Sequence, residues 1–82
     1  MNRTQTKNVA SYWADGEPAC NSGAQFWTDG QRLYSYKLQF GDTSDGGLKI
    51  LRDHTANGRH GYHSNTTSKH VGYARKYADI ID

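Results

Sequence analysis

The chain has 82 residues and a formal net charge of +2, so it is one small domain and not a strongly acidic mimic of DNA. Leu, Ile, Val and Phe together number only eleven, but six Tyr and two Trp add large apolar rings. The low net charge argues against disorder and favours a folded domain with a thin, aromatic-rich core. Because such a core stabilises a fold only weakly, a homodimer or another partner could help to stabilise this one.

Cellular location is indicated by two further features. Cys20 is the single cysteine, so no disulfide can form within the chain, and a packed small side chain is favoured over a reactive thiol. The first nine residues are polar and carry no apolar signal segment, and no run approaches the roughly 20 apolar residues that span a bilayer. We therefore expect a soluble, intracellular protein with no membrane partner.

In chain order, residues 1–8 are predicted to be a flexible N-terminus and residues 9–82 a single α+β domain. Asp-Gly or Asn-Gly pairs recur at intervals of 12 to 16 residues. They are Asp15-Gly16, Asp29-Gly30, Asp45-Gly46 and Asn57-Gly58. Such pairs favour two-residue hairpin turns because both residues tolerate positive φ. The series predicts a small antiparallel β-meander of four to six strands.

The segments between the turns supply the strands. Short strands are expected at 9–13 and 25–28, each ending in an aromatic-Trp-small-Asp-Gly phrase, which fits a strand end followed by a turn better than a paired sugar-binding platform. Residues 34–40 alternate between apolar and polar, which predicts a half-buried strand with Tyr34, Tyr36, Leu38 and Phe40 on one face. A following strand is expected at 48–51. After Asn57-Gly58, residues 59–63 are predicted to return as a hairpin arm.

The C-terminal part changes period and predicts one helix over about 67–80, packed on one face of the sheet. Thr66 or Thr67 can cap its N-terminus. Val71, Ala74, Ala78 and Ile81 follow at spacings of three, four and three, so we expect this stripe to dock on the tyrosine face of the sheet.

Four histidines, His54, His60, His63 and His70, fall within seventeen residues and raise the question of a metal site. A hairpin at 57–58 would place His54 and His63 on one face and His60 on the other, which disfavours such a site. No nucleophile–base arrangement or phosphate-binding loop stands out. The sequence therefore predicts a protein that is not an enzyme and has no cofactor.

Charge is distributed unevenly along the chain. Residues 14–48 contain five acids and two bases, whereas residues 49–76 contain six bases and one acid. Helical spacing places Lys69, Tyr73 and Lys76 on the solvent side of the predicted helix. The candidate partner-binding residues are the bases and tyrosines of this region: Arg52, Arg59, Tyr62, Lys69, Tyr73, Arg75 and Lys76. Such a set suits phosphates with stacked bases, an acidic protein surface, or simple solvation.

Two stretches, Arg32-Leu33-Tyr34-Ser35-Tyr36 and Thr66-Thr67-Ser68-Lys69-His70-Val71, carry a resemblance. With them, the chain resembles small uncharacterised bacteriophage accessory proteins that have a Thr-Thr-Ser-Lys/Arg-His segment before a C-terminal helix. The predicted hairpin at 57–58 departs from that pattern. Proteins of this kind commonly occupy a surface on a host macromolecule, and host defence complexes such as CRISPR effectors are frequent targets.

Two functional hypotheses follow. The first is a non-enzymatic, phage-encoded protein that binds and blocks a host protein assembly with an acidic surface, in the manner of an anti-CRISPR inhibitor. The second is a nucleic-acid-binding module that uses the basic C-terminal half.

Overall fold

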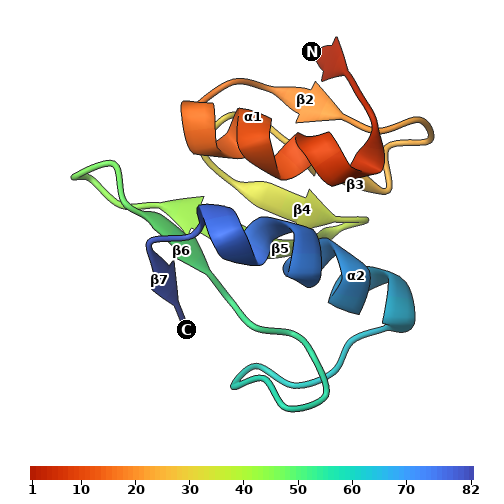
Figure 1. Ribbon diagram of the computed structural model, residues 1–82, viewed down its shortest axis with the longest axis vertical. Coiled ribbons are helices and arrows are strands. Elements are labelled where there is room, and N and C mark those ends of the chain that lie inside the picture. The colour runs from red at the N-terminus through yellow and green to blue at the C-terminus, as the bar shows by residue number, and fades with distance from the viewer.

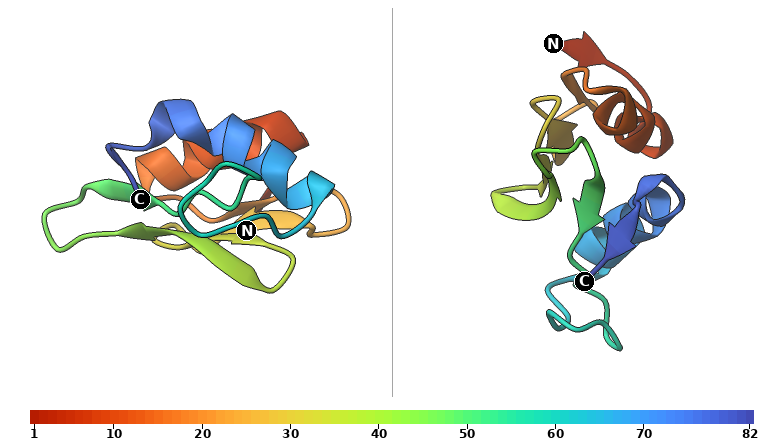
Figure 2. Two further views of the ribbon diagram at one scale, coloured as in Figure 1. Left: turned by 90° about the horizontal axis from the view of Figure 1, so that it is seen from below. Right: turned by 90° about the vertical axis from the view of Figure 1, so that its left-hand side faces the viewer.

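Both helices of the protein lie on one face of a seven-stranded sheet (Figures 1 and 2). The computed structural model describes all 82 residues. The strands are β1 (Asn2–Arg3), β2 (Ala19–Cys20), β3 (Phe26–Thr28), β4 (Leu33–Ser35), β5 (Leu38–Thr43), β6 (Lys49–Leu51) and β7 (Ile80–Ile81). The helices are α1 (Val9–Asp15) and α2 (Asn65–Ala74), with short 3-10 helices η1 (Thr6–Asn8) before α1 and η2 (Arg75–Tyr77) after α2. Neither α1 nor α2 has the length and apolar character needed to cross a membrane.

The strands lie in the sheet in chain order. Strands β2 to β6 form an antiparallel meander, and β1 and β7 add to its two edges in parallel. The predicted α+β class with a C-terminal helix is confirmed. The predicted strand number and the all-antiparallel sheet are wrong, because α1 and α2 act as crossovers, which parallel neighbours require. The two added strands are only two residues long and leave no periodic signal in the sequence.

Residues 9–13, expected as a strand, belong to helix α1. Val9, Ala10 and Trp13 are fully buried, and their i, i+1 and i+4 positions lie on one face of a helix. Gly16 ends α1 in the left-handed conformation, with φ of 77°, and its N–H donates to the carbonyl of Trp13. Asp15-Gly16 is therefore a helix C-cap rather than a hairpin turn.

Residues 34–40, expected as one strand, are two strands joined by a tight turn at 36–37. Ser35 pairs with Leu38 across this turn, and Tyr36 takes a positive φ of 56°. Tyr34 and Tyr36 therefore do not share a buried face with Phe40. The apolar and polar residues of this stretch alternate as in one strand, but Tyr36 and Lys37 reverse the chain. The alternation therefore does not correspond to one continuous strand.

The two tryptophans of the repeated phrase occupy different places. Trp13 is fully buried and donates through Nε1 to the carbonyl of Gln31 at 2.9 Å. Trp27 is half-buried on the sheet face away from the helices, where its ring stacks on Tyr34 with 4.0 Å between centroids. The two rings therefore do not form a paired platform.

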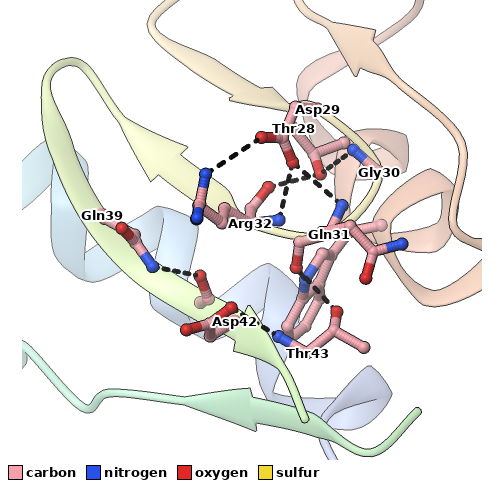
Figure 3. Close-up of polar contacts among 10 residues, drawn as sticks. Thr28, Asp29, Gly30, Gln31, Arg32, Gln39, Asp42 and Thr43 are labelled. Atoms are coloured by element: carbon pink, nitrogen blue, oxygen red, sulfur yellow. Dashed lines mark hydrogen bonds and ion pairs between the residues drawn. The ribbon is translucent and has the colours of Figure 1, made fainter. Parts of the chain in front are cut away.

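Of the four predicted hairpin turns, those at 29–30 and 45–46 are confirmed as turns between neighbouring strands, and those at 15–16 and 57–58 are wrong. Asp29 and Gly30 lie in the β3–β4 loop, where Asp29 Oδ1 accepts from the N–H groups of Gln31 and Arg32 (Figure 3). Residues 45–46 lie in the β5–β6 turn. Residues 52–64 contain no strand, so the hairpin arm at 59–63 does not exist.

Helix α2 begins and ends earlier than expected. Ser64, not Thr66 or Thr67, is the N-cap, and its Oγ accepts from the N–H of Thr67 at 3.1 Å. The helix ends at Ala74 and continues only as the short η2. Val71 and Ala74 are buried as predicted, whereas residue 81 is 45% exposed and belongs to β7.

The N-terminal residues 1–8, predicted to be flexible, carry β1 and η1 in the structure. Asn21 Nδ2 donates to Thr6 Oγ1 at 3.0 Å and so connects η1 to the segment after β2. The mobility of these residues in solution stays a prediction, but their position places Lys7 beside α2.

The core lies between the helices and the sheet. Its apolar members come from both helices and from β3 to β6: Val9, Ala10, Trp13, Phe26, Leu33, Phe40, Leu51, Val71 and Ala74. Lys49 is also buried there, with Nζ 5.5 Å from the centre of the Trp13 ring and 2.8 Å from Thr43 Oγ1. The aromatic-rich core predicted from composition is thus completed by a buried lysine.

We expect Gly30→Ala to lower the free energy of unfolding by at least about 2 kcal/mol. Gly30 has φ of 102°, and an added Cβ would lie 2.7 Å from the carbonyl oxygen of Gly16. The control is Gly47→Ala, which has a φ of 85° but meets no atom within 4 Å and should cost about 1 kcal/mol. Urea denaturation measures both, and an equal loss in the two variants would contradict the close packing of the two loops.

Candidate functional site

A groove runs between η1 and α2. One depression is lined by Lys7, Asn8, Gly72, Tyr73, Lys76 and Tyr77. A second depression shares Tyr73 with the first and is lined also by Thr6, Asn21, Gln25, Tyr36, Thr66, Lys69 and His70. We call the two together the α2 groove and the second one the His70 pocket. Because η1 forms one wall, the groove exists only when the N-terminal segment is docked beside α2.

The α2 groove is basic, and its lysines are not neutralised. Lys7, Lys69 and Lys76 line it, none of them forms an ion pair, and no Asp or Glu is among the lining residues. Arg3 and Lys37 line two adjoining depressions that also lack acids. The fold therefore gathers five bases on neighbouring concave surfaces without a carboxylate between them.

Other bases of the chain are paired outside the groove. Arg32 lies 4.0 Å from Asp29, and an ion pair of 3.4 Å joins Arg59 to Asp82. A third pair of 3.1 Å joins Arg75 to Asp53. Three of the eight acidic side chains are thus paired with arginines outside the groove, and none lines the groove, so its positive charge is available to a partner.

The structure divides the seven residues predicted to bind a partner. Lys69, Tyr73 and Lys76 line the α2 groove together. The others lie outside it and have partners within the chain: Arg59 and Arg75 pair with carboxylates, Arg52 Nη1 donates to the carbonyl of Gln39, and Tyr62 Oη donates to Asn65 Oδ1.

Sequence reasoning missed several groove residues. Lys7 belongs to the segment predicted to be flexible, and Tyr77 was not among the candidates. Asn21 and Gln25 come from the connection between β2 and β3. Only tertiary contacts bring these segments to α2, so no local pattern could have identified them, although the basic character of Lys7 was visible.

A chain of buried hydroxyl groups joins α2 to β4. Ser64 Oγ donates to Thr67 Oγ1 at 3.1 Å, Thr67 Oγ1 lies 2.9 Å from Ser35 Oγ, and Ser35 Oγ lies 2.7 Å from His70 Nδ1. Ser35 and Thr67 are fully buried and His70 is 3% exposed. The two stretches on which the phage resemblance rests are therefore in direct contact.

One order of donors in this chain gives every hydroxyl proton an acceptor, and that order fixes which ring nitrogen of His70 carries the proton. Ser64 donates to Thr67, so the hydroxyl proton of Thr67 has Ser35 as its remaining acceptor. Ser35 then directs its own proton to Nδ1 of His70, the other group within its reach. In that order of donors, a neutral His70 is protonated on Nε2.

The other side of the His70 ring reaches the groove. The only hydrogen bond of the ring uses Nδ1, so Nε2 has no partner within the protein. Every side-chain nitrogen or oxygen that is fully buried does have a partner, so Nε2 is not fully buried. Nε2 is therefore open at the His70 pocket. The ring is held flat on Phe26, with 4.4 Å between centroids and 6° between planes. Burial lowers the pKa of His70 to about 4, so the ring is neutral at pH 7.

Ser35 and His70 meet at the distance of a nucleophile and its base, but Ser35 is fully buried and no carboxylate bonds to the ring. A substrate could not reach this hydroxyl, so the pair acts in packing.

The other three histidines lie in the 52–64 segment. The rings of His54 and His60 are 5.4 Å apart, and His60 Nε2 lies 3.0 Å from Asp82 Oδ2. The expected pairing of His54 with His63 on a hairpin face is wrong, because the hairpin is absent. No three His, Cys, Asp or Glu side chains gather closely enough to hold a metal ion.

Comparison with protein-family models, with curated proteins and with solved structures found no match to this chain. The functional interpretation therefore rests on the geometry and charge of the α2 groove.

Burial of His70 predicts that stability falls as the pH drops from 6.5 towards 4. The pKa of its side chain is about 4 in the folded protein and 6.5 in the unfolded chain, so the unfolded state binds more protons across this window. The loss should approach about 3 kcal/mol. Burial also lowers the pKa of His54, which acts in the same direction within this window, and the lowered pKa values of Asp29, Asp53 and Asp82 act in the same direction mainly below pH 4.

The measurement is urea denaturation at pH 7.5, 6, 5 and 4.5, with His70→Phe as the control because it keeps a ring on Phe26 but cannot titrate. The variant should lose most of the slope between pH 6.5 and 4.5. Equal slopes in the two proteins would contradict the burial of a neutral His70.

Proposed function

We propose that this protein is a non-enzymatic, phage-encoded inhibitor that docks its α2 groove on an acidic surface of a host protein assembly, such as a defence complex, in the host cytoplasm. The observation that carries the proposal is the sorting of charge. The lysines that line the groove have no carboxylate partners, whereas three arginines elsewhere are paired.

Several like charges in one concave surface act together on a partner. At physiological salt they attract an acidic surface over a Debye length of about 8 Å and raise the association rate. A single exposed ion pair would contribute only about 0–1 kcal/mol, so the lysines alone would favour encounter more than affinity.

Aromatic side chains supply the short-range part of the contact. Tyr73 is 38% exposed and belongs to both depressions of the groove, between Lys69 of α2 and Lys76 of η2. Tyr77 lies next to it, with Lys76 Nζ 5.2 Å from its ring centre. Partly buried tyrosines lose little side-chain entropy on binding and are enriched among the residues that dominate interface energies.

Blocking fits this surface better than turnover. The reactive-looking pair of Ser35 and His70 is closed to substrate, and the accessible groups of the groove are donors and rings suited to contact. The phage resemblance favours the same class of action, because it implies occupation of a host surface.

Reversal of two groove charges tests the proposal. We expect Lys69→Glu with Lys76→Glu to weaken partner binding at least tenfold, about 1.4 kcal/mol, while leaving the melting temperature within a few degrees. The matched control is Arg32→Glu with Arg59→Glu, which makes the same change in net charge outside the groove. Quantitative pull-down from a bacterial lysate identifies the partner, and titration of the purified partner gives the affinities.

The blocking step needs its own readout. A strain with an active defence system should regain phage infection when it expresses the wild-type protein or the Arg32/Arg59 control, but not the Lys69/Lys76 variant. If the Lys69/Lys76 variant folds and both binds and blocks fully, the site lies elsewhere.

Nucleic acid is the second candidate, and the observation that favours it is the alternation of Lys69, Tyr73 and Lys76 with Tyr77 along one groove. Lysines can contact phosphates while tyrosine rings stack on bases. Binding of a 15-nucleotide single strand should then weaken steeply between 50 and 200 mM salt, with a log–log slope of about −0.7 for each phosphate neutralised. No binding, or a flat salt response, would remove this candidate.

A further inference from the structure

The His70 pocket differs from the rest of the α2 groove in the direction of its hydrogen-bonding groups. Its amide side chains are fixed from within the protein. Asn21 Oδ1 accepts from the N–H of Phe26 at 3.0 Å, and Asn21 Nδ2 donates to Thr6 Oγ1 at 3.0 Å and to Gln25 Oε1 at 3.2 Å. The backbone N–H of Phe26 thus sets the orientation of Asn21, and Asn21 sets that of Gln25.

Within this network the amide oxygens accept hydrogen bonds from the protein, whereas several N–H and O–H donors of the pocket have no acceptor. Each amide oxygen, on Asn21 and on Gln25, already accepts one hydrogen bond from within the protein. The Nε2 protons of Gln25 and the hydroxyl proton of Thr6 have no acceptor in the protein, and Lys69 adds an unpaired ammonium group.

His70 contributes the donor with the least freedom. With Nδ1 accepting from Ser35, Nε2 carries the proton and opens at the pocket, and the ring lies flat against Phe26. A nearly buried N–H that meets no protein acceptor is ready to bind one from outside.

We propose that the His70 pocket receives a single carboxylate group, presented by an acidic side chain of the partner protein. This assignment rests on the proposed function and names the chemical group that the partner supplies. Neutral donors together with one ammonium group match one negative charge. A phosphate dianion would favour further cationic or bidentate donors, and Lys69 is the only charged side chain that lines the pocket.

Gln25→Glu tests the pocket with little change in shape. A glutamate oxygen can still accept from Asn21 Nδ2, but the free amide donor becomes an anion that repels a carboxylate. Gln31→Glu is the matched control, because it makes the same change at an exposed glutamine outside the groove.

The probe is a fluorescein-labelled peptide of alternating Glu and Ser, compared with the matching Gln–Ser peptide by fluorescence anisotropy at fixed salt. We expect the wild-type protein and the Gln31 variant to bind the Glu peptide at least tenfold more tightly than the Gln peptide. The Gln25 variant should lose that preference, and amide NMR shifts caused by the Glu peptide should centre on residues 66–70.

The outcomes separate this inference from the proposed function. Partner binding that Lys69→Glu with Lys76→Glu abolishes but Gln25→Glu leaves unchanged would overturn the carboxylate pocket alone. A Gln25-sensitive preference for the Glu peptide would support the pocket even if no protein partner is recovered. Stronger competition by inorganic phosphate than by acetate at equal ionic strength would overturn the assignment to a carboxylate.

Discussion

The hydrogen bond between Ser35 and His70 is the contact on which the placement of α2 depends. The buried face of this helix consists of Thr67, His70, Val71 and Ala74, which offers little apolar surface. Hydrophobic burial alone would therefore hold α2 weakly. The hydroxyl chain and the stacking of His70 on Phe26 supply the missing attachment, and each buried group in it would cost stability if its partner were removed.

The same bond determines what the protein presents to its surroundings. By occupying Nδ1 it directs the N–H of His70 outward, and by fixing α2 beside η1 it brings Lys69 and Lys76 opposite Lys7. The same hydrogen bond thus satisfies the buried polar groups of the core and directs a donor into the groove. No carboxylate lines the groove, so the groove retains its positive charge.

The sequence was informative where local chemistry and tertiary structure agree. The strand at 26–28, the turn at 29–30 and the burial of Val71 and Ala74 all follow from local patterns. Residues 9–13 and 34–40 misled because β-branched and aromatic side chains serve equally in a short helix, a strand or a turn, and only packing decides between them. The solvent side of α2 could be read from helical spacing, but Lys7, Asn21 and Gln25 join it through contacts between distant segments. In the sequence nothing separates His70 from the other three histidines. Its buried position against Ser35 and Phe26 is visible only in the structure.

The central claim is that His70 is a neutral, buried hydrogen-bond donor whose proton lies on Nε2. Long-range ¹H–¹⁵N correlation spectra of the histidine rings report the protonation of each nitrogen directly. At pH 7 the account predicts one ring with a protonated Nε2 and an unprotonated Nδ1, assigned to His70 by its loss in His70→Phe. A ring protonated on Nδ1, or on both nitrogens, would contradict the donor order from Ser64 through Ser35 and with it the donor-lined pocket.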